Sequence, residues 1–233
     1  VISKPEIPYV DLAGQHKLLK AELMESVCNV FDHGQFIFGQ EVETLEQQFA
    51  ELCGVKFAVS VNSGTDALIL ALRVLGIGPG DEVIVPGFTW VSTANAVWHC
   101  GATPVFCDIE LATWNINKSR VEQHITDRTV GIIPVHLFGL FADMPQIAAI
   151  AEKYSLWVVE DAACAFGARD AAGGCGTGGD VGCFSFHPRK IITTGEGGSI
   201  LTNDKAIYNK IKILRSHGIC LLYTSPSPRA ATL

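Results

Sequence analysis

The chain has 233 residues and a formal charge of −7, with a pI near 5.5 and no cluster of lysine and arginine, which argues against a nucleic-acid or anionic membrane surface. The mean hydropathy of +0.28 is high, but no apolar run reaches the roughly 18 residues of a membrane span, so we assign the apolar residues to a core or a subunit interface. The N-terminal residues lack a secretory signal pattern, and the eight cysteines show no CxxC spacing. We therefore expect free, mostly buried thiols in a cytoplasmic protein.

Apolar spacing predicts two helices near the N-terminus, at residues 17–33 and 41–53, the first of them an arm at the domain edge. Further along, strand-like apolar runs alternate with helical segments, as in βαβ units. The predicted strands are 56–61, 82–85, 103–106, 130–135, 156–160, 181–186 and 198–201, and the helices between and after them are 65–75, 91–100, 145–154 and 204–215. This order predicts an α/β domain with a mostly parallel seven-stranded sheet between helices.

Ligands of such sheets bind beyond the carboxyl ends of the strands. Asp161 follows an apolar strand, where its carboxylate is poorly solvated unless a cation meets it, and a protonated pyridine nitrogen is such a cation. The alternative for Asp161 is a helix cap. Glu160 should point to the opposite side because strand side chains alternate, and we assign it no catalytic role.

Lys190 follows another predicted strand, behind Pro188, and a lysine amine can form an imine with an aldehyde and then act as a general base. The alternative is a solvated surface lysine. Arg189 beside it stays protonated and cannot form an imine. A carboxylate and a lysine presented in this way indicate pyridoxal 5′-phosphate.

A phosphate site is predicted at the strand-to-helix turn of Ser63, Gly64 and Thr65, where helix N–H groups and hydroxyls gather, with Ser185 as a further hydroxyl. The alternative for the turn is an ordinary N-cap. Trp90 follows a third strand and can stack on the pyridine ring, or else lie in the core.

Two other patterns are set aside. The GxGxxG match at residues 174–179 precedes a strand instead of linking a strand to a helix, so we predict a flexible loop without a dinucleotide. His136, His187 and His217 lack the spacing of a metal site, and we expect structural roles for them.

Several blocks occur in an order that strongly resembles the DegT/DnrJ/EryC1/StrS family of sugar aminotransferases. They are SGTDAL from Ser63, GIGPGDEVIVPGFTWVSTANAV from Gly76, EDAA from Glu160, GDVGCFSFHPRK from Gly179 and TTGEGG from Thr193. The resemblance covers residues 5–218. It implies a fold-type I pyridoxal phosphate enzyme, usually a homodimer, that transfers an amino group from glutamate to a keto sugar attached to a nucleotide, giving amino sugars for surface polysaccharides or secondary metabolites.

The resemblance implies roles for individual residues. Lys190 matches the Schiff-base lysine, Asp161 the pyridine partner and Trp90 the stacking residue, while Gly64, Thr65 and Ser185 match phosphate contacts. Cys164 departs from the pattern, because many members carry glutamine or histidine there, near the cofactor's 3′ oxygen. That contact is either absent here or made by a thiol. Lys190 argues against a sugar dehydratase of the family, which has histidine at that position, and the Asp161 and Lys190 pair argues against a noncatalytic regulator.

The end of the chain has a different character. Residues 220–229 read CLLYTSPSPR, without helical or strand periodicity, and resemble the translation of a transposase-type sequencing adapter. A natural proline and serine linker is the alternative. We therefore expect a large domain over residues 1–218, a non-native tail over 219–233, and a missing small C-terminal domain, so that the chain as written folds poorly or is inactive.

Overall fold

The computed structural model describes residues 10–169 and 173–216. The proposed tail and His217 lie outside the described residues. The chain divides into two compact units, Val1–Leu45 and Glu46–Leu233. Each unit is described by itself.

The first unit holds helix α1 (Leu12–His33) and the start of α2 (Gln40–Cys53). Helix α1 begins earlier than predicted because Asp11 caps it, accepting the backbone N–H of Gly14 through its side chain. It ends at Gly34, whose left-handed conformation (φ 72°) is the usual glycine C-cap. Both N-terminal helices predicted from the sequence are therefore present, and α1 lies in the smaller unit.

The second unit contains the predicted sheet and most of the helices. Its strands are β1 (Phe57–Val61), β2 (Glu82–Pro86), β3 (Thr103–Cys107), β4 (Thr129–Ile132), β5 (Trp157–Asp161), β6 (Val181–Ser185) and β7 (Gly198–Thr202). Its helices are α3 (Gly64–Val74), α4 (Ser92–His99), α5 (Lys118–Val121), α6 (Met144–Tyr154) and α7 (Lys205–Arg215), with 3₁₀ turns η1 (Glu122–His124) and η2 (Leu137–Gly139). The short elements α5, η1 and η2 were not predicted.

The sheet has seven strands in the order β1-β7-β6-β5-β4-β2-β3, which confirms the predicted architecture. Strand β7 runs antiparallel to β1 and β6, and all other neighbouring pairs are parallel. Residues 186–197 link β6 to β7 without a helix, as an antiparallel connection allows. Because β7 alone is reversed, the carboxyl ends of the other six strands share one edge.

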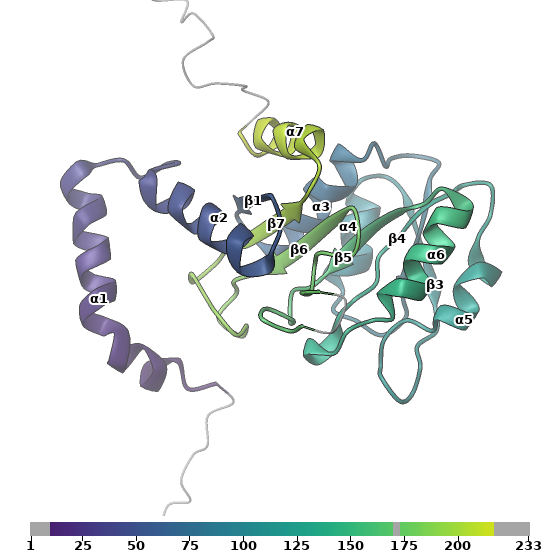
Figure 1. Cartoon of the computed structure of the whole chain (residues 1–233), viewed down its shortest axis with the longest axis horizontal. Helices are drawn as coiled ribbons and strands as arrows, with labels where there is room; N and C mark the ends of the chain where they lie inside the picture. The colour runs from purple at the N-terminus through teal and green to yellow at the C-terminus, as the bar shows by residue number, and fades with distance from the viewer. Residues whose placement is uncertain (1–9, 170–172, 217–233) are drawn as a thin grey trace, which may run out of the picture. The chain divides into compact units, whose positions relative to one another are not determined.

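Both faces of the sheet are covered by helices (Figure 1). Residues in β2 alternate: Val83 and Val85 pack in one cluster with α3, α4 and α7, whereas Ile84 packs in another with α5 and α6. The end of α2 covers the face on which Ile84 lies. Its Phe49 and Ala50 pack there against residues of β1, β6 and β7. Strands buried on both sides read as continuous apolar runs, which is why they were visible in the sequence.

None of the seven described cysteines forms a disulfide. Cys107, Cys175 and Cys183 are buried, but Cys28 is exposed, so the expectation of buried thiols fails there. Across residues 10–169 and 173–216, no helix is long and apolar enough to cross a membrane.

Candidate active site

Strands β5 and β6 present two of the predicted site residues at the carboxyl edge of the sheet. Val159 and Cys183 belong to the core cluster on the α3 and α4 face. Asp161 and Ser185 lie two residues further along their strands, so they are on that same face. Glu160 is on the opposite face, as the strand alternation predicted.

The Asp161 carboxylate is almost fully buried, with 6% of its surface exposed. Its Oδ2 accepts a hydrogen bond from the hydroxyl of Thr93 at 2.8 Å, and its Oδ1 accepts one from the backbone N–H of Ala163 at 3.2 Å. Burial raises the pKa of Asp161, and the hydrogen bonds and the charge of Lys190 oppose this shift. A carboxylate whose charged form is disfavoured by burial is suited to a cationic partner.

Lys190 lies in the turn after β6, where its backbone N–H donates to the carbonyl of His187 at 2.9 Å. Its Nζ donates to Sγ of Cys164 at 3.1 Å. Cys164 lies three residues after Asp161, so the turns that follow β5 and β6 meet here. The structure thus brings together Asp161, Cys164 and Lys190, although their roles remain predictions.

The predicted phosphate site lies at the start of α3. A Cβ atom added to Gly64 would lie 2.7 Å from Cβ of Ser185, so glycine permits this close approach. Among the described residues, the backbone N–H groups of Gly64 and Thr65 have no hydrogen-bond partner, as is usual for the first turn of a helix. Ser63 does cap the helix, its Oγ accepting from the N–H of Asp66 at 3.0 Å. The capping alternative is therefore correct for Ser63. Near this cap lie the other predicted phosphate contacts, which are the backbone amides of Gly64 and Thr65 and the hydroxyl of Ser185.

Two hydroxyl residues at the start of α4 were missed in the sequence. Thr93 binds Asp161, and Ser92 Oγ accepts a hydrogen bond from Thr65 Oγ1 at 3.0 Å. Their position at the start of the helix that follows β2 was the available signal. Trp90 belongs to the same turn: its carbonyl accepts the N–H of Thr93 at 3.1 Å, and its ring is 73% exposed. A stacking role for Trp90 remains a prediction.

Glu160 forms a buried network on the other face of the sheet. Its carboxylate accepts backbone N–H groups of Gly176, Gly178 and Gly179 at 2.6 to 3.0 Å and contacts His136 Nε2 at 2.7 Å. Nδ1 of His136 accepts the N–H of Ala142, so Nε2 carries a proton and donates it to the Glu160 carboxylate. Glu160 therefore anchors the end of the glycine-rich loop that we had predicted to be flexible.

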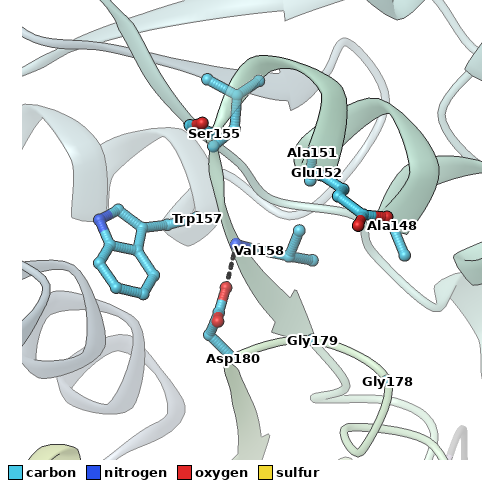
Figure 2. A pocket seen from close by; sticks show the side chains of 10 residues that line it. Ala148, Ala151, Glu152, Ser155, Trp157, Val158, Gly178, Gly179 and Asp180 are labelled. Atoms are coloured by element: carbon cyan, nitrogen blue, oxygen red, sulfur yellow. Dashed lines mark hydrogen bonds between the residues drawn. The ribbon is translucent and has the colours of Figure 1, made fainter.

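A separate pocket of about 430 Å³ lies at the amino ends of β5 and β6 (Figure 2). The start of β5, helix α6 and residues 178–180 line it. Oδ2 of Asp180 accepts the backbone N–H of Val158 there at 2.8 Å, shown as a dashed line. This pocket is on the edge of the sheet opposite Asp161, so we assign the chemistry to the carboxyl edge and not to the pocket.

The model of the DegT/DnrJ/EryC1/StrS aminotransferase family matches residues 17–224. The chain belongs to this family. A UDP-N-acetyl-3-dehydro-alpha-D-glucosamine 3-aminotransferase of Acidithiobacillus ferrooxidans is 48% identical over 91% of this chain and 58% of the relative.

Two solved structures resemble the chain in three dimensions. DesV of S. venezuelae, solved with a ketimine intermediate, is 41% identical with a TM-score of 0.92, and the match covers 96% of this chain and 61% of DesV. A putative sugar aminotransferase of Streptococcus pneumoniae in its PLP form is 33% identical with a TM-score of 0.76, covering 82% and 55%. The chain therefore spans less than two thirds of the length of these relatives.

Proposed function

We propose that the protein containing this chain uses pyridoxal 5′-phosphate to transfer an amino group to a keto sugar attached to a nucleotide. The observation that carries the proposal is the convergence of Asp161, Lys190 and the start of α3 at one edge of the sheet. The family membership and the PLP form of the pneumococcal structure support the same cofactor.

The residues at the carboxyl edge fit the three polar parts of this cofactor. The unpartnered N–H groups of Gly64 and Thr65, with the Ser185 hydroxyl, suit a phosphate. The buried Asp161 carboxylate suits a protonated ring nitrogen, and the Lys190 amine suits the aldehyde carbon. When bound, pyridoxal phosphate supplies an electron sink for the negative charge that a substrate carbon gains on losing a proton.

The chain's own side chains would orient and protonate the reactants. Asp161, held by Thr93, would favour a proton on the ring nitrogen of a bound cofactor, and Nζ of Lys190 would serve as the general base and acid. Trp90 would stack on the ring and Cys164 would lie beside it. Ser63 would support the phosphate site by capping α3.

The substrate class is proposed from the family and its relatives. The 48% identical relative is named for a 3-dehydro UDP-sugar, so a UDP-linked 3-keto sugar is the first substrate to assay. We propose glutamate as the amino donor and a homodimer as the active form, both from the family resemblance. A cytoplasmic location is proposed from the free cysteines, which fit a reducing compartment.

Absorption spectroscopy and a product assay on the full-length protein test the proposal. We expect a visible absorption band after addition of pyridoxal phosphate, and conversion of glutamate and the keto sugar into 2-oxoglutarate and the amino sugar. Lys190→Ala should abolish both, whereas Lys153→Ala, which removes a lysine that is 61% exposed on α6, should change neither. A full-length protein without the band would instead be a noncatalytic binding protein, and a bound cofactor with dehydration but no transfer would indicate a dehydratase.

A further inference from the structure

Cys164 directly contacts the amine of Lys190. The distance between Nζ and Sγ is 3.1 Å, with the nitrogen donating to the sulfur. Both side chains are only partly buried, so small solutes can reach them. The turns after β5 and β6 fix this contact, because Cys164 belongs to the first and Lys190 to the second.

Four other thiols, those of Cys53, Cys100, Cys107 and Cys183, have less reactive surroundings. Burial raises the pKa of Cys53 and of Cys107 to about 11, and it raises that of Cys183 well above the usual value. Sγ of Cys100 lies against a backbone carbonyl oxygen. Peroxides react with the thiolate form, and oxidation occurs mainly at accessible cysteines beside a basic group. Cys164 is partly exposed and lies beside the amine of Lys190.

We propose that Cys164 and Lys190 form a peroxide-sensitive modification site in which the two side chains become joined by a sulfur–nitrogen bond. Hydrogen peroxide transfers one oxygen atom to Sγ, giving a sulfenic acid and one molecule of water. The neutral amine of Lys190 attacks this sulfur, hydroxide leaves and takes up the amine proton as a second water, and the Sγ–Nζ bond remains. The protein has lost two hydrogen atoms and two electrons, and the peroxide has been reduced to water.

Thiols can reduce the Sγ–Nζ bond. A dithiol attacks the sulfur, the nitrogen leaves with a proton, and reduction of the resulting mixed disulfide restores the free thiol. The functional consequence rests on the proposed function. A Lys190 amine bonded to sulfur cannot bond to the cofactor, so oxidation inactivates the enzyme until the sulfur–nitrogen bond is reduced. A cofactor already bonded to Lys190 should protect the site.

Peptide mass spectrometry tests the bond without any assay of activity. The full-length protein, stripped of cofactor, is treated with hydrogen peroxide, its remaining thiols are alkylated, and it is digested with trypsin. We expect a cross-linked product that joins the peptides of Cys164 and Lys190, lighter by two hydrogen atoms than their sum, and lost after dithiothreitol. Prior loading with pyridoxal phosphate should reduce its yield several-fold.

Matched variants separate this bond from other oxidation products. Cys164→Ser should abolish the cross-link, Lys190→Arg should leave a sulfenic acid that dimedone traps, and Cys28→Ser, at an exposed cysteine elsewhere, should have no effect. Finding Cys164 only as a disulfide or sulfinic acid, with Lys190 unmodified, would overturn the proposal. A cross-link in a protein that binds no cofactor would support the modification site but contradict the proposed function.

Discussion

At the scale of single residues, Asp161 shows how burial prepares a side chain for a cationic partner. Burial raises its pKa, so the folded protein holds the proton more tightly than the unfolded chain. The contribution of Asp161 to stability is thus full below the ordinary pKa of 3.8 and is lost as the pH rises through the raised value. Above that raised value the ionised carboxylate destabilises the fold when no cation is bound.

Asp161→Asn should therefore stabilise the cofactor-free protein at neutral pH while abolishing transfer. An asparagine can accept from the N–H of Ala163 through its oxygen, and its amide nitrogen can donate to the Thr93 hydroxyl, which reverses the bond that Thr93 now donates, so both neighbours keep a partner. Urea unfolding over a pH series measures the effect, and the advantage of the variant should shrink as the pH falls. An asparagine variant that is less stable than the parent at neutral pH would contradict this account.

Gly64→Ala tests the close approach of α3 to β6. The added methyl carbon would lie 2.7 Å from Cβ of Ser185, so the helix must shift, and we expect a loss of about 1–3 kcal/mol in unfolding free energy with weaker phosphate binding. Gly78→Ala is the matched control, since its nearest neighbour would be 3.8 Å away. Adding Ser185→Gly to Gly64→Ala should recover stability, measured by denaturant unfolding, but not phosphate binding.

At the scale of elements, hydrogen bonds to the Glu160 carboxylate hold the glycine-rich loop against the end of β5. Glu160 at the end of β5 accepts three backbone N–H groups of the segment 174–179 and contacts His136, whose own N–H donates to the carbonyl of Asp161 at 3.0 Å. Hydrogen bonds to a buried charge are stronger than neutral ones. The network therefore fixes the loop 174–179 and the segment that follows β4 to the carboxyl end of β5.

Glu160→Gln should destabilise the protein by about 2–3 kcal/mol, because its amide nitrogen would face backbone donors instead of accepting from them. Hydrogen exchange of residues 174–179 should accelerate in this variant. Glu122→Gln, which alters an exposed ion pair with Lys153, should cost much less stability than Glu160→Gln. Equal losses in the two variants would refute the anchoring role of Glu160.

At the scale of the whole molecule, cofactor binding should stabilise the fold. A ligand that binds only the native state adds about 2.7 kcal/mol at a concentration 100 times its Kd. We expect pyridoxal phosphate to raise the Tm in a thermal scan of the full-length protein, and pyridoxal, which lacks the phosphate that Gly64 and Thr65 would bind, to raise it less. Equal effects of the two compounds would count against the proposed phosphate site.

The sequence by itself determined the order of elements and most of the carboxyl-edge residues. Strands buried on both faces are apolar throughout, and Asp161 and Ser185 follow such runs, so local pattern was sufficient to find them. The apolar pattern does not encode the direction of a strand such as β7, and the four-residue helix α5 is too short to show a helical period. Thr93 was missed because its role depends on a hydrogen bond to a residue 68 positions away.

Only the tertiary structure decided which side chains meet. The sheet order places β5 beside β6, and their two following turns bring the thiol of Cys164 to the amine of Lys190. It also showed that Ser63 is a cap and that Glu160 anchors the glycine-rich loop. Periodicity reports the face on which a residue lies, whereas contacts between distant segments arise from strand order and packing, which no local pattern encodes.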